Sequence, residues 1–299
     1  MEKMKFHAEC AACLVEANLR KAAPVQDQAL RAEYMRKICE IIAEADIQRE
    51  APPLVDARII RLRRDLLGIE DDFTAIKHSF NQLLLGLCDE LRARIDAAED
   101  PLYAALQLSM AGNYIDFGVL RDVDPDELLR LLDDAAEKHV DREEYEQLRA
   151  DLARPGGELV FIHDNCGEIV LDKLLIETIK RLYPQQEIVS LVRGTPVLND
   201  ATLEDAVEAG LPEVAELMEN GLEYVAGTDL ERVPEAVRER ICNAKLVIAK
   251  GQGNFETLTG CNLNVYYLFL SKCPGYTQWY GFERFSGILA NDRRMRFGC

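Results

Sequence analysis

The chain has 299 residues, 48% of them hydrophobic and 29% charged, which is the composition of a soluble globular protein with one large or two ordinary domains. Its 35 Lys and Arg residues face 53 Asp and Glu residues, so the formal net charge is -18. This charge repels nucleic acid and anionic membranes and argues against either as a partner. No apolar run approaches the roughly 20 residues of a membrane span, and the N-terminal residues are polar where a signal peptide is apolar. We therefore expect a cytoplasmic protein.

The first half of the chain is predicted to be helical. Apolar residues recur at helical spacing over residues 6–22, 27–49, 54–67 and 72–98, and the last segment predicts the longest helix. Pro101 suits the first turn of another helix, and the acidic stretch Asp124-Pro125-Asp126-Glu127 is typical of a helix start. Since no strand pattern interrupts these helices, we expect an added all-helical domain over residues 1–155.

After Pro155-Gly156-Gly157 the pattern changes to strands that alternate with helices. The predicted strands are residues 159–162, 188–192, 246–249 and 265–270, with 224–226 as a shorter candidate, and the predicted helices are residues 168–182, 202–209 and 235–243. Alternation of this kind is typical of βαβ units. The fold class is therefore expected to be α/β, with a parallel-rich sheet flanked by helices over residues 156–299.

Polar residues follow the first predicted strand, at Asp164, Asn165 and Glu168. Ligands of open α/β sheets bind at the carboxyl ends of the strands. A carboxylate beside an amide offers the hard oxygen ligands that Mg²⁺ or Mn²⁺ prefers. Asp164 could instead simply cap the following helix, but a cap does not require Asn165, Gly167 and Glu168 as well. The cluster therefore favours a site.

Two further strand ends carry polar residues. The second predicted strand leads through Arg193 to Asn199 and Asp200, and parallel strand ends point the same way, so Asp200 can approach Asp164. The junction Lys250-Gly251-Gln252-Gly253-Asn254 follows the strand at 246–249. Its glycines let backbone N–H groups face an anion, and Lys250 adds a positive charge. The junction is neither a Walker loop nor a dinucleotide fingerprint, because its Lys and glycines stand at other spacings.

Together these junctions predict a divalent metal ion held by Asp164, Asn165 and Asp200, opposite an anion pocket formed by Lys250 and the loop 251–254. Two carboxylates and an amide leave coordination positions open, which suits a catalytic ion better than a structural one. A hard ion that faces a lysine and backbone amides can bind and polarise a phosphoryl group.

Two stretches of the helical half carry groups that packing alone does not explain. The stretch 112–118 interrupts a helical pattern, and its Asn113 and Asp116 could project together from one turn or instead bond the backbone of a turn. Cys10-Ala-Ala-Cys13 has the spacing of half a metal site, but no second close pair accompanies it. Nine cysteines in an acidic chain of this size predict mostly reduced thiols. Cys10 and Cys13 are interpreted either as part of an apolar helix face or as metal or redox ligands.

The strand-end motifs resemble those of the damage-control phosphatase family, long described as a domain of unknown function. The matching residues are Asp164-Asn165-Cys166-Gly167-Glu168, Arg193-Gly194-Thr195-Pro196 with Asn199-Asp200, and Lys250-Gly251-Gln252-Gly253-Asn254-Phe255-Glu256. Cys10-Ala-Ala-Cys13 and the stretch 112–117 resemble the prokaryotic branch, so the likeness spans nearly the whole chain. The resemblance implies a metal-dependent hydrolase of small phosphorylated metabolites, either sugar phosphates or damaged cofactor phosphates, with Mn, Ni, Co or Mg as its cofactor.

The resemblance also implies roles for individual residues. Metal ligation falls on Asp164, Asn165 and Asp200, and a substrate-side role falls on Asn113 and Asp116. The predicted phosphate and substrate contacts are completed by Lys250, Gly251, Gly253, Asn254 and Arg193. We expect the catalytic residues to be Asp164, Glu168 and Lys250.

The sequence leaves the mechanism and one alternative function open. Water could attack phosphorus beside a metal held by Asp164, or Asp164 could itself attack and form an aspartyl phosphate. Glu168 could orient water or only accept backbone N–H groups. The alternative function is a non-catalytic protein that binds a metal or a phosphometabolite. A small-molecule or protein-carboxyl methyltransferase ranks lower, because no glycine-rich strand-to-helix turn typical of a methyl-donor site is present. No oligomeric state follows from the sequence.

Overall fold

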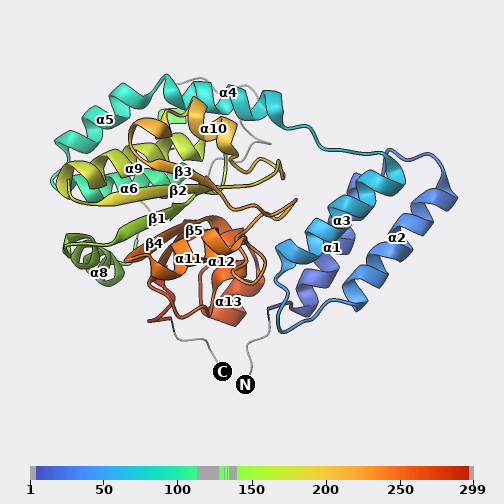
Figure 1. The fold of residues 1–299 in the computed structure, drawn as a ribbon. Coiled ribbons are helices and arrows are strands. Elements are labelled where there is room, and N and C mark those ends of the chain that lie inside the picture. The colour runs from blue at the N-terminus through green and yellow to red at the C-terminus, as the bar shows by residue number, and fades with distance from the viewer. Residues whose placement is uncertain (1–4, 113–127, 131, 133, 135–139, 296–299) are drawn as a thin grey trace.

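A single sheet organises the protein, whose computed structural model describes residues 5–112, 128–130, 132, 134 and 140–295. Within these ranges six strands lie in the order β3-β2-β1-β4-β5-β6 (Figure 1). Their bounds are Glu158–Ile162 (β1), Glu187–Val192 (β2), Glu216–Glu219 (β3), Leu246–Lys250 (β4), Val265–Leu270 (β5) and Gly287–Asn291 (β6). Neighbours from β3 to β5 pair in parallel, and β6 is antiparallel to β5. The predicted α/β class with a parallel-rich sheet is confirmed.

Helices cover both faces of this sheet (Figure 1). One face carries α4 (Thr74–Leu85), α5 (Cys88–Ala97), α6 (Pro101–Ala111), α9 (Glu168–Leu182) and α10 (Leu203–Glu208), and α8 (Arg142–Ala153) joins the same core. A short 3-10 helix, Leu211–Glu213, follows α10. The opposite face carries α11 (Glu235–Asn243), α12 (Gly251–Leu258) and α13 (Gly275–Tyr280). Because successive residues of each strand face different cores, the central strands are apolar on both sides.

Three N-terminal helices pack beside the sheet: α1 (Ala8–Lys21), α2 (Gln28–Ala43) and α3 (Pro52–Leu67) (Figure 1). They enclose a small core of their own, made of Phe6, Ala22, Tyr34, Ile38, Val55 and Ile59. Leu54 and Ala57 of α3 pack instead into the core that contains α12. The added helical unit is therefore present. The sequence places its end near residue 155, whereas α4, α5, α6 and α8 share a core with the strands.

Several local predictions differ from the structure. Gly86 divides the helix predicted over residues 72–98 into α4 and α5, since glycine is a poor helix former. Residues 224–226 form no strand, and Tyr224 has a left-handed φ of 60°. β3 was not predicted because Glu-Leu-Met-Glu is an edge strand with exposed ends, and the residues expected to start a helix at 124–127 lie outside the described ranges. None of the described helices combines the length and apolarity needed to cross a membrane.

Candidate active site

The predicted strand-end residues meet where the strand order reverses. β1 lies between β2 and β4, and the chain continues outward to β3 on one side and to β5 on the other. Doubly wound sheets bind their ligands at this position. Backbone bonds tie the two strand ends together, since Ala201 N–H donates to the Asp164 carbonyl at 2.7 Å and Cys166 N–H donates to the Asn199 carbonyl at 2.9 Å. Asn165 and Asp200 consequently form a β-bridge, as the predicted approach of Asp200 requires.

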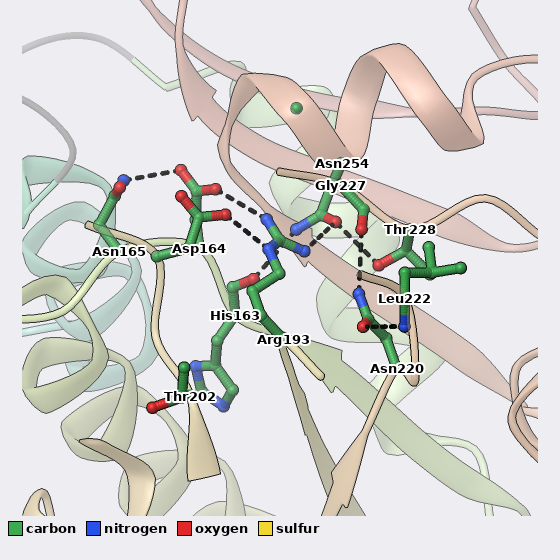
Figure 2. A network of polar contacts seen from close by, with 12 residues as sticks. His163, Asp164, Asn165, Arg193, Thr202, Asn220, Leu222, Gly227, Thr228 and Asn254 are labelled. Atoms are coloured by element: carbon green, nitrogen blue, oxygen red, sulfur yellow. Dashed lines mark hydrogen bonds and ion pairs between the residues drawn. The ribbon is translucent and has the colours of Figure 1, made fainter. Parts of the chain in front are cut away.

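Arg193 joins the carboxylates of the two strand ends. Its Nε donates to Asp200 Oδ2 at 2.5 Å, and its Nη2 donates to Asp164 Oδ1 at 3.1 Å. Its Nη1 donates to Asn254 Oδ1 at 2.8 Å, and Figure 2 shows the guanidinium between Asp164 and Asn254. Only 1% of the side chain is exposed. Arg193, which the sequence assigns to the substrate, thus uses its hydrogen bonds to hold the side chains of the site.

Asn165 and Gly251 fix the other side of the Asp164 carboxylate. Asn165 Nδ2 donates to Asp164 Oδ2 at 2.7 Å and to Glu168 Oε2 at 3.1 Å. Gly251 lies against the same carboxylate, because a Cβ at residue 251 would come within 1.9 Å of Asp164 Oδ2. The φ of residue 251 is +79°, a value that also favours glycine. Both the space and the backbone conformation therefore require glycine at this position.

The loop predicted at residues 251–254 is the first turn of α12, which begins at Gly251. The first N–H groups of a helix have no intrahelical acceptor and favour anions. This turn can therefore present donors to an anion beside Asp164. Gly253 packs against another segment, and a Cβ there would come within 1.9 Å of the Ala226 carbonyl oxygen. The close packing explains the second glycine without a substrate contact.

Asn254 links three segments of the site rather than facing outward. Its Nδ2 donates to the carbonyls of His163 at 3.0 Å and Lys250 at 2.7 Å. Its Oδ1 accepts from Arg193 and from Thr228 Oγ1, the latter at 3.0 Å (Figure 2). The side chain is fully buried. Asn254, predicted to bind substrate, is therefore engaged by the protein on every polar atom of its amide.

Lys250 points into the protein, away from the first N–H groups of α12, where the sequence led us to expect its ammonium group. Its Nζ donates to Glu168 Oε1 at 2.5 Å, to Asp172 Oδ1 at 2.7 Å, and to the carbonyl and Oγ of Ser109 at 2.8 and 2.9 Å. The side chain is 0% exposed. Asp172 extends this network to His163, whose Nδ1 lies 2.9 Å from Asp172 Oδ2. Two acidic residues one helical turn apart on α9 thus draw Lys250 inward.

Six side chains form what we call the strand-end cluster: Asp164, Glu168, Asp172, Asp200, Arg193 and Lys250. With all of them ionised, four negative charges face two positive charges, which leaves an excess of two negative charges. Burial, and then repulsion from Asp200 and Glu168, raises the pKa of Asp164 to about 8. Burial also raises the pKa of Asp200, although Arg193 opposes the shift. For Asp172, burial is outweighed by Lys250 and His163, and the pKa is lowered.

The donor set at this position fits the divalent ion that the sequence predicts. Asp164, Asn165 and Asp200 offer oxygen ligands, and neither Asn165 Oδ1 nor Asp200 Oδ1 accepts a hydrogen bond from a described residue. A divalent cation would also favour the ionised form of Asp164, whose pKa is raised, and would balance the two negative charges that the ionised cluster carries in excess. Among the described residues no three His, Cys, Asp or Glu side chains group to hold a metal ion. The predicted ion would be held by two carboxylates together with the Asn165 amide, and it stays a prediction.

The remaining predicted substrate residues, Asn113 and Asp116, lie outside the described ranges. Gly112, which precedes them, lies against Glu168, since a Cβ at Gly112 would come within 3.0 Å of Glu168 Cγ. Sequence reasoning missed four buried polar residues of the site: His163, Ser109, Asp172 and Asn220. Asn220, after β3, accepts from Gly194 N–H at 2.9 Å and donates to the Gly227 carbonyl at 3.0 Å (Figure 2). The spacing of Glu168 and Asp172 on an apolar helix face was the available signal.

Cys10 and Cys13 lie on α1, apart from the strand-end cluster. Cys10 is half-buried against the core of the N-terminal helices, and Cys13 is exposed. Burial raises the pKa of Cys10 to about 12, which disfavours the reactive thiolate. Within the described part of the chain, neither cysteine belongs to a group of three or more His, Cys, Asp or Glu side chains that could hold a metal ion. These observations favour the interpretation as part of a helix face.

Known proteins are similar to this one over most of the chain, including the residues of the strand-end cluster. Residues 6–285 match the family model described as Damage-control phosphatase ARMT1-like domain. The chain is 29% identical over 274 residues to a damage-control phosphatase of Archaeoglobus fulgidus, covering 90% of this chain and 93% of that protein. It is 28% identical over 273 residues to a damage-control phosphatase of Pyrococcus horikoshii, covering 91% and 92%. A crystal structure of a DUF89 family protein from Pyrococcus horikoshii matches with a TM-score of 0.82 and 25% identity, covering 96% of this chain and 98% of that one.

Proposed function

Because the chain belongs to the damage-control phosphatase ARMT1-like domain family, we propose that it is a metal-dependent phosphatase that hydrolyses phosphomonoesters of small metabolites. The observation that carries this proposal is the excess of carboxyl groups over cations, four against two, in the buried strand-end cluster. A phosphoryl group brings further negative charge, so the cluster would repel it unless a cation lay between them. Sugar phosphates and damaged cofactor phosphates are the substrate classes we favour.

Asp164, Asn165 and Asp200 would hold the ion, for which Mn²⁺, Ni²⁺, Co²⁺ and Mg²⁺ are the candidates. When bound, the ion would polarise the phosphoryl oxygens and offset their charge. Arg193 fixes both carboxylates through Asp164 Oδ1 and Asp200 Oδ2. Since Asn165 also bonds Asp164 Oδ2, the Asp164 carboxylate is held from two sides. This suits a fixed ligand better than a nucleophile that must move onto phosphorus.

Glu168 has a positioning role in this scheme. One of its oxygens accepts from Lys250 and the other from Asn165, at 2.5 and 3.1 Å. Lys250 is itself anchored by Asp172 and Ser109. Asn165 is thereby held with its Nδ2 toward the carboxylates, which leaves its Oδ1 for the ion. The predicted catalytic contribution of Glu168 and Lys250 then acts through Asn165.

The test is hydrolysis of p-nitrophenyl phosphate by the purified protein after chelation with EDTA and resupply of each candidate ion. We expect turnover to disappear on chelation and to return with at least one of the four ions. The Asp200→Asn protein, purified in the same way, controls for contaminating phosphatases. A panel of sugar phosphates and nucleotides then separates the substrate classes. One bound ion per chain without turnover of any phosphomonoester would instead indicate a non-catalytic binding protein.

A further inference from the structure

The two cysteines of α1, which the strand-end cluster does not use, face a third cysteine. Cys10 and Cys13 lie three residues apart on α1, and residues at this spacing share one face of a helix. Cys10 lines a small cavity together with Glu256 and Tyr276. Tyr276 N–H donates to the carbonyl of Cys273 at 3.2 Å. This face of α1 is therefore directed at the segment that contains Cys273.

The three thiols lie close enough to act on one another. Burial raises the pKa of Cys10 to about 12, and the charges of Cys273 and Cys13 add to the shift. Burial also raises the pKa of Cys273, and the charge of Cys13 adds to it. All three thiols are free in the structure, and Cys13 is the exposed one. A reagent that arrives from solvent therefore meets Cys13 first.

Helix geometry indicates which of these thiols can pair. The Cβ atoms of residues three apart on a helix are separated by about 5–6 Å, whereas those of a disulfide are separated by about 3.5–4.5 Å. A bond between Cys10 and Cys13 would therefore distort α1. A bond from Cys13 to Cys273 joins two separate segments and leaves the helix intact. The half-buried Cys10, whose thiolate is disfavoured, would stay reduced.

We propose that Cys13 and Cys273 form a reversible disulfide in response to low-molecular-weight disulfides such as oxidised glutathione. The Cys13 thiolate attacks one sulfur of the reagent and releases one reagent thiolate, which leaves a mixed disulfide on Cys13. The Cys273 thiolate then attacks the Cys13 sulfur and releases the second reagent thiolate. The two cysteines lose one proton each to solvent, and the reagent is reduced to two thiols. In a reducing compartment such a bond is transient and senses oxidation.

The bond would affect the active site through a short series of contacts. Cys273 N–H donates to Gln252 Oε1 at 3.3 Å, and Gln252 belongs to the first turn of α12. Gly251, which precedes it, lies against the Asp164 carboxylate. A disulfide that draws Cys273 toward α1 would strain the contact with Gln252 and shift this turn. The effect on turnover therefore rests on the proposed function, whereas the disulfide itself does not.

The experiment treats the reduced, purified protein with oxidised glutathione and maps its disulfides by mass spectrometry of peptides that are never exposed to reductant. The wild type is compared with Cys13→Ser, Cys273→Ser, Cys10→Ser and Cys39→Ser, the last of which replaces an exposed cysteine of α2. We expect the Cys13–Cys273 link in the wild type, in Cys10→Ser and in Cys39→Ser, and no link to either residue in the other two. Where the link forms, turnover of p-nitrophenyl phosphate should fall by roughly 10- to 100-fold and should return with dithiothreitol.

The outcomes separate the disulfide from the proposed function. A wild-type protein that carries glutathione on Cys13 but forms no link to Cys273 would overturn the proposal, and so would a link from Cys273 to α1 that survives in Cys13→Ser. Stoichiometric zinc that is lost from both Cys13→Ser and Cys273→Ser would also overturn it, because the thiols would then be metal ligands. Unchanged turnover in the linked protein would overturn the effect on the active site. If the reduced wild type turns over no phosphomonoester, the proposed function fails, and the peptide map still decides the disulfide.

Discussion

Two groups of buried charged side chains lie close together in this protein, and they differ in charge balance. The strand-end cluster contains four carboxyl groups and two cations. Between α4 and α10, Lys77 pairs with Asp205 at 2.5 Å, one charge of each sign. Asp205 also accepts from Asn81 Nδ2 at 3.2 Å and from the N–H and hydroxyl groups of Thr202 at 2.8 and 2.9 Å. The pair is complete within the protein, whereas the cluster is not.

The difference indicates which buried charges serve structure and which serve a ligand. When both partners of a buried ion pair are present and their hydrogen bonds are made, their mutual attraction offsets much of the free energy lost by removing the charges from water. A buried group with more carboxyl groups than cations is unfavourable until a cation binds. Burial raises the pKa of both Asp164 and Asp200, and for Asp164 repulsion from the neighbouring carboxylates adds to the shift. We therefore interpret the Lys77–Asp205 pair as an attachment between two helices, and the strand-end cluster as a binding site.

The largest effect is expected for Asp200→Asn in the strand-end cluster. The amide keeps the shape of the side chain but removes one of the charges that would hold the ion. We expect turnover to fall by roughly 1,000-fold and the bound metal to be lost. The metal-free variant should melt at or above the temperature of the metal-free wild type, because one surplus negative charge is gone. Full metal content in Asp200→Asn would contradict the assignment of the ligands.

The matching Asp-to-Asn substitution in the Lys77–Asp205 pair should change the stability of the protein rather than its turnover. Asp205→Asn leaves the Lys77 ammonium group buried without a carboxylate and should lower the free energy of unfolding by roughly 3 kcal/mol. Turnover per folded molecule and metal content should stay near the wild-type values. Replacing both partners, by Lys77→Met with Asp205→Leu, should recover most of the loss because no charge remains buried. Urea titrations measure the stabilities, and a loss of metal from Asp205→Asn would show that the pair belongs to the site.

The sequence predicted the central part of the fold because that part follows simple patterns. β1, β2, β4 and β5 are buried on both faces, so each appears as a continuous apolar run. β3 and β6 lie at the edges of the sheet, where one side of the ladder is unpaired and the apolar run is weaker. The convergence of Asp164, Asn165 and Asp200 was predictable as well, since parallel strand ends meet at one edge.

The direction of Lys250 was not predictable in the same way. Its partner Ser109 lies 141 residues earlier on α6, and Asp172 lies 78 residues earlier on α9. Which side of β4 the ammonium group takes depends on those packed helices, and a single strand does not encode it. The contacts of Arg193 were unpredictable for a related reason, because a cation beside two carboxylates can serve the protein as well as a substrate. Local motifs predicted which residues gather at the strand ends, but the contacts that each of them makes depend on distant parts of the chain.

The third prediction concerns Gly251, the glycine that borders the strand-end cluster. Gly251 and Gly156 have similar positive φ values, +79° and +74°, but a Cβ at Gly251 would overlap the Asp164 carboxylate while Gly156 has open space around it. In both alanine variants, the left-handed backbone conformation should lower the free energy of unfolding by roughly 1–2 kcal/mol. The overlap with Asp164 should lower the free energy of unfolding of Gly251→Ala by a further amount of roughly 1–3 kcal/mol. This variant should also bind metal more weakly. Equal unfolding free energies for the two variants would show that Asp164 moves aside freely.

The smallest effect concerns Glu256 of α12, a carboxyl group with neutral partners that resembles neither the cluster nor the pair. Tyr276 Oη donates to its Oε1 at 2.7 Å and Gln252 Nε2 donates at 3.0 Å. Burial raises the pKa of Glu256 above its usual value of 4.5, so the folded protein holds this proton at pH values where the unfolded chain has released it. Its contribution to stability is therefore present below about pH 4.5 and is lost as the pH rises toward the folded pKa.

Glu256→Gln has no proton to lose, so its stability should fall less between pH 4.5 and pH 7.5 than that of the wild type. The two curves should therefore diverge as the pH rises, with the wild type losing stability relative to Glu256→Gln. Subtracting the curves removes the titration of every other group, because those groups are common to both proteins. Urea unfolding at four or five pH values measures the difference, with metal-free protein used throughout so that binding at the strand-end cluster does not contribute. Parallel curves would mean that Glu256 ionises as readily in the folded protein as in the unfolded chain.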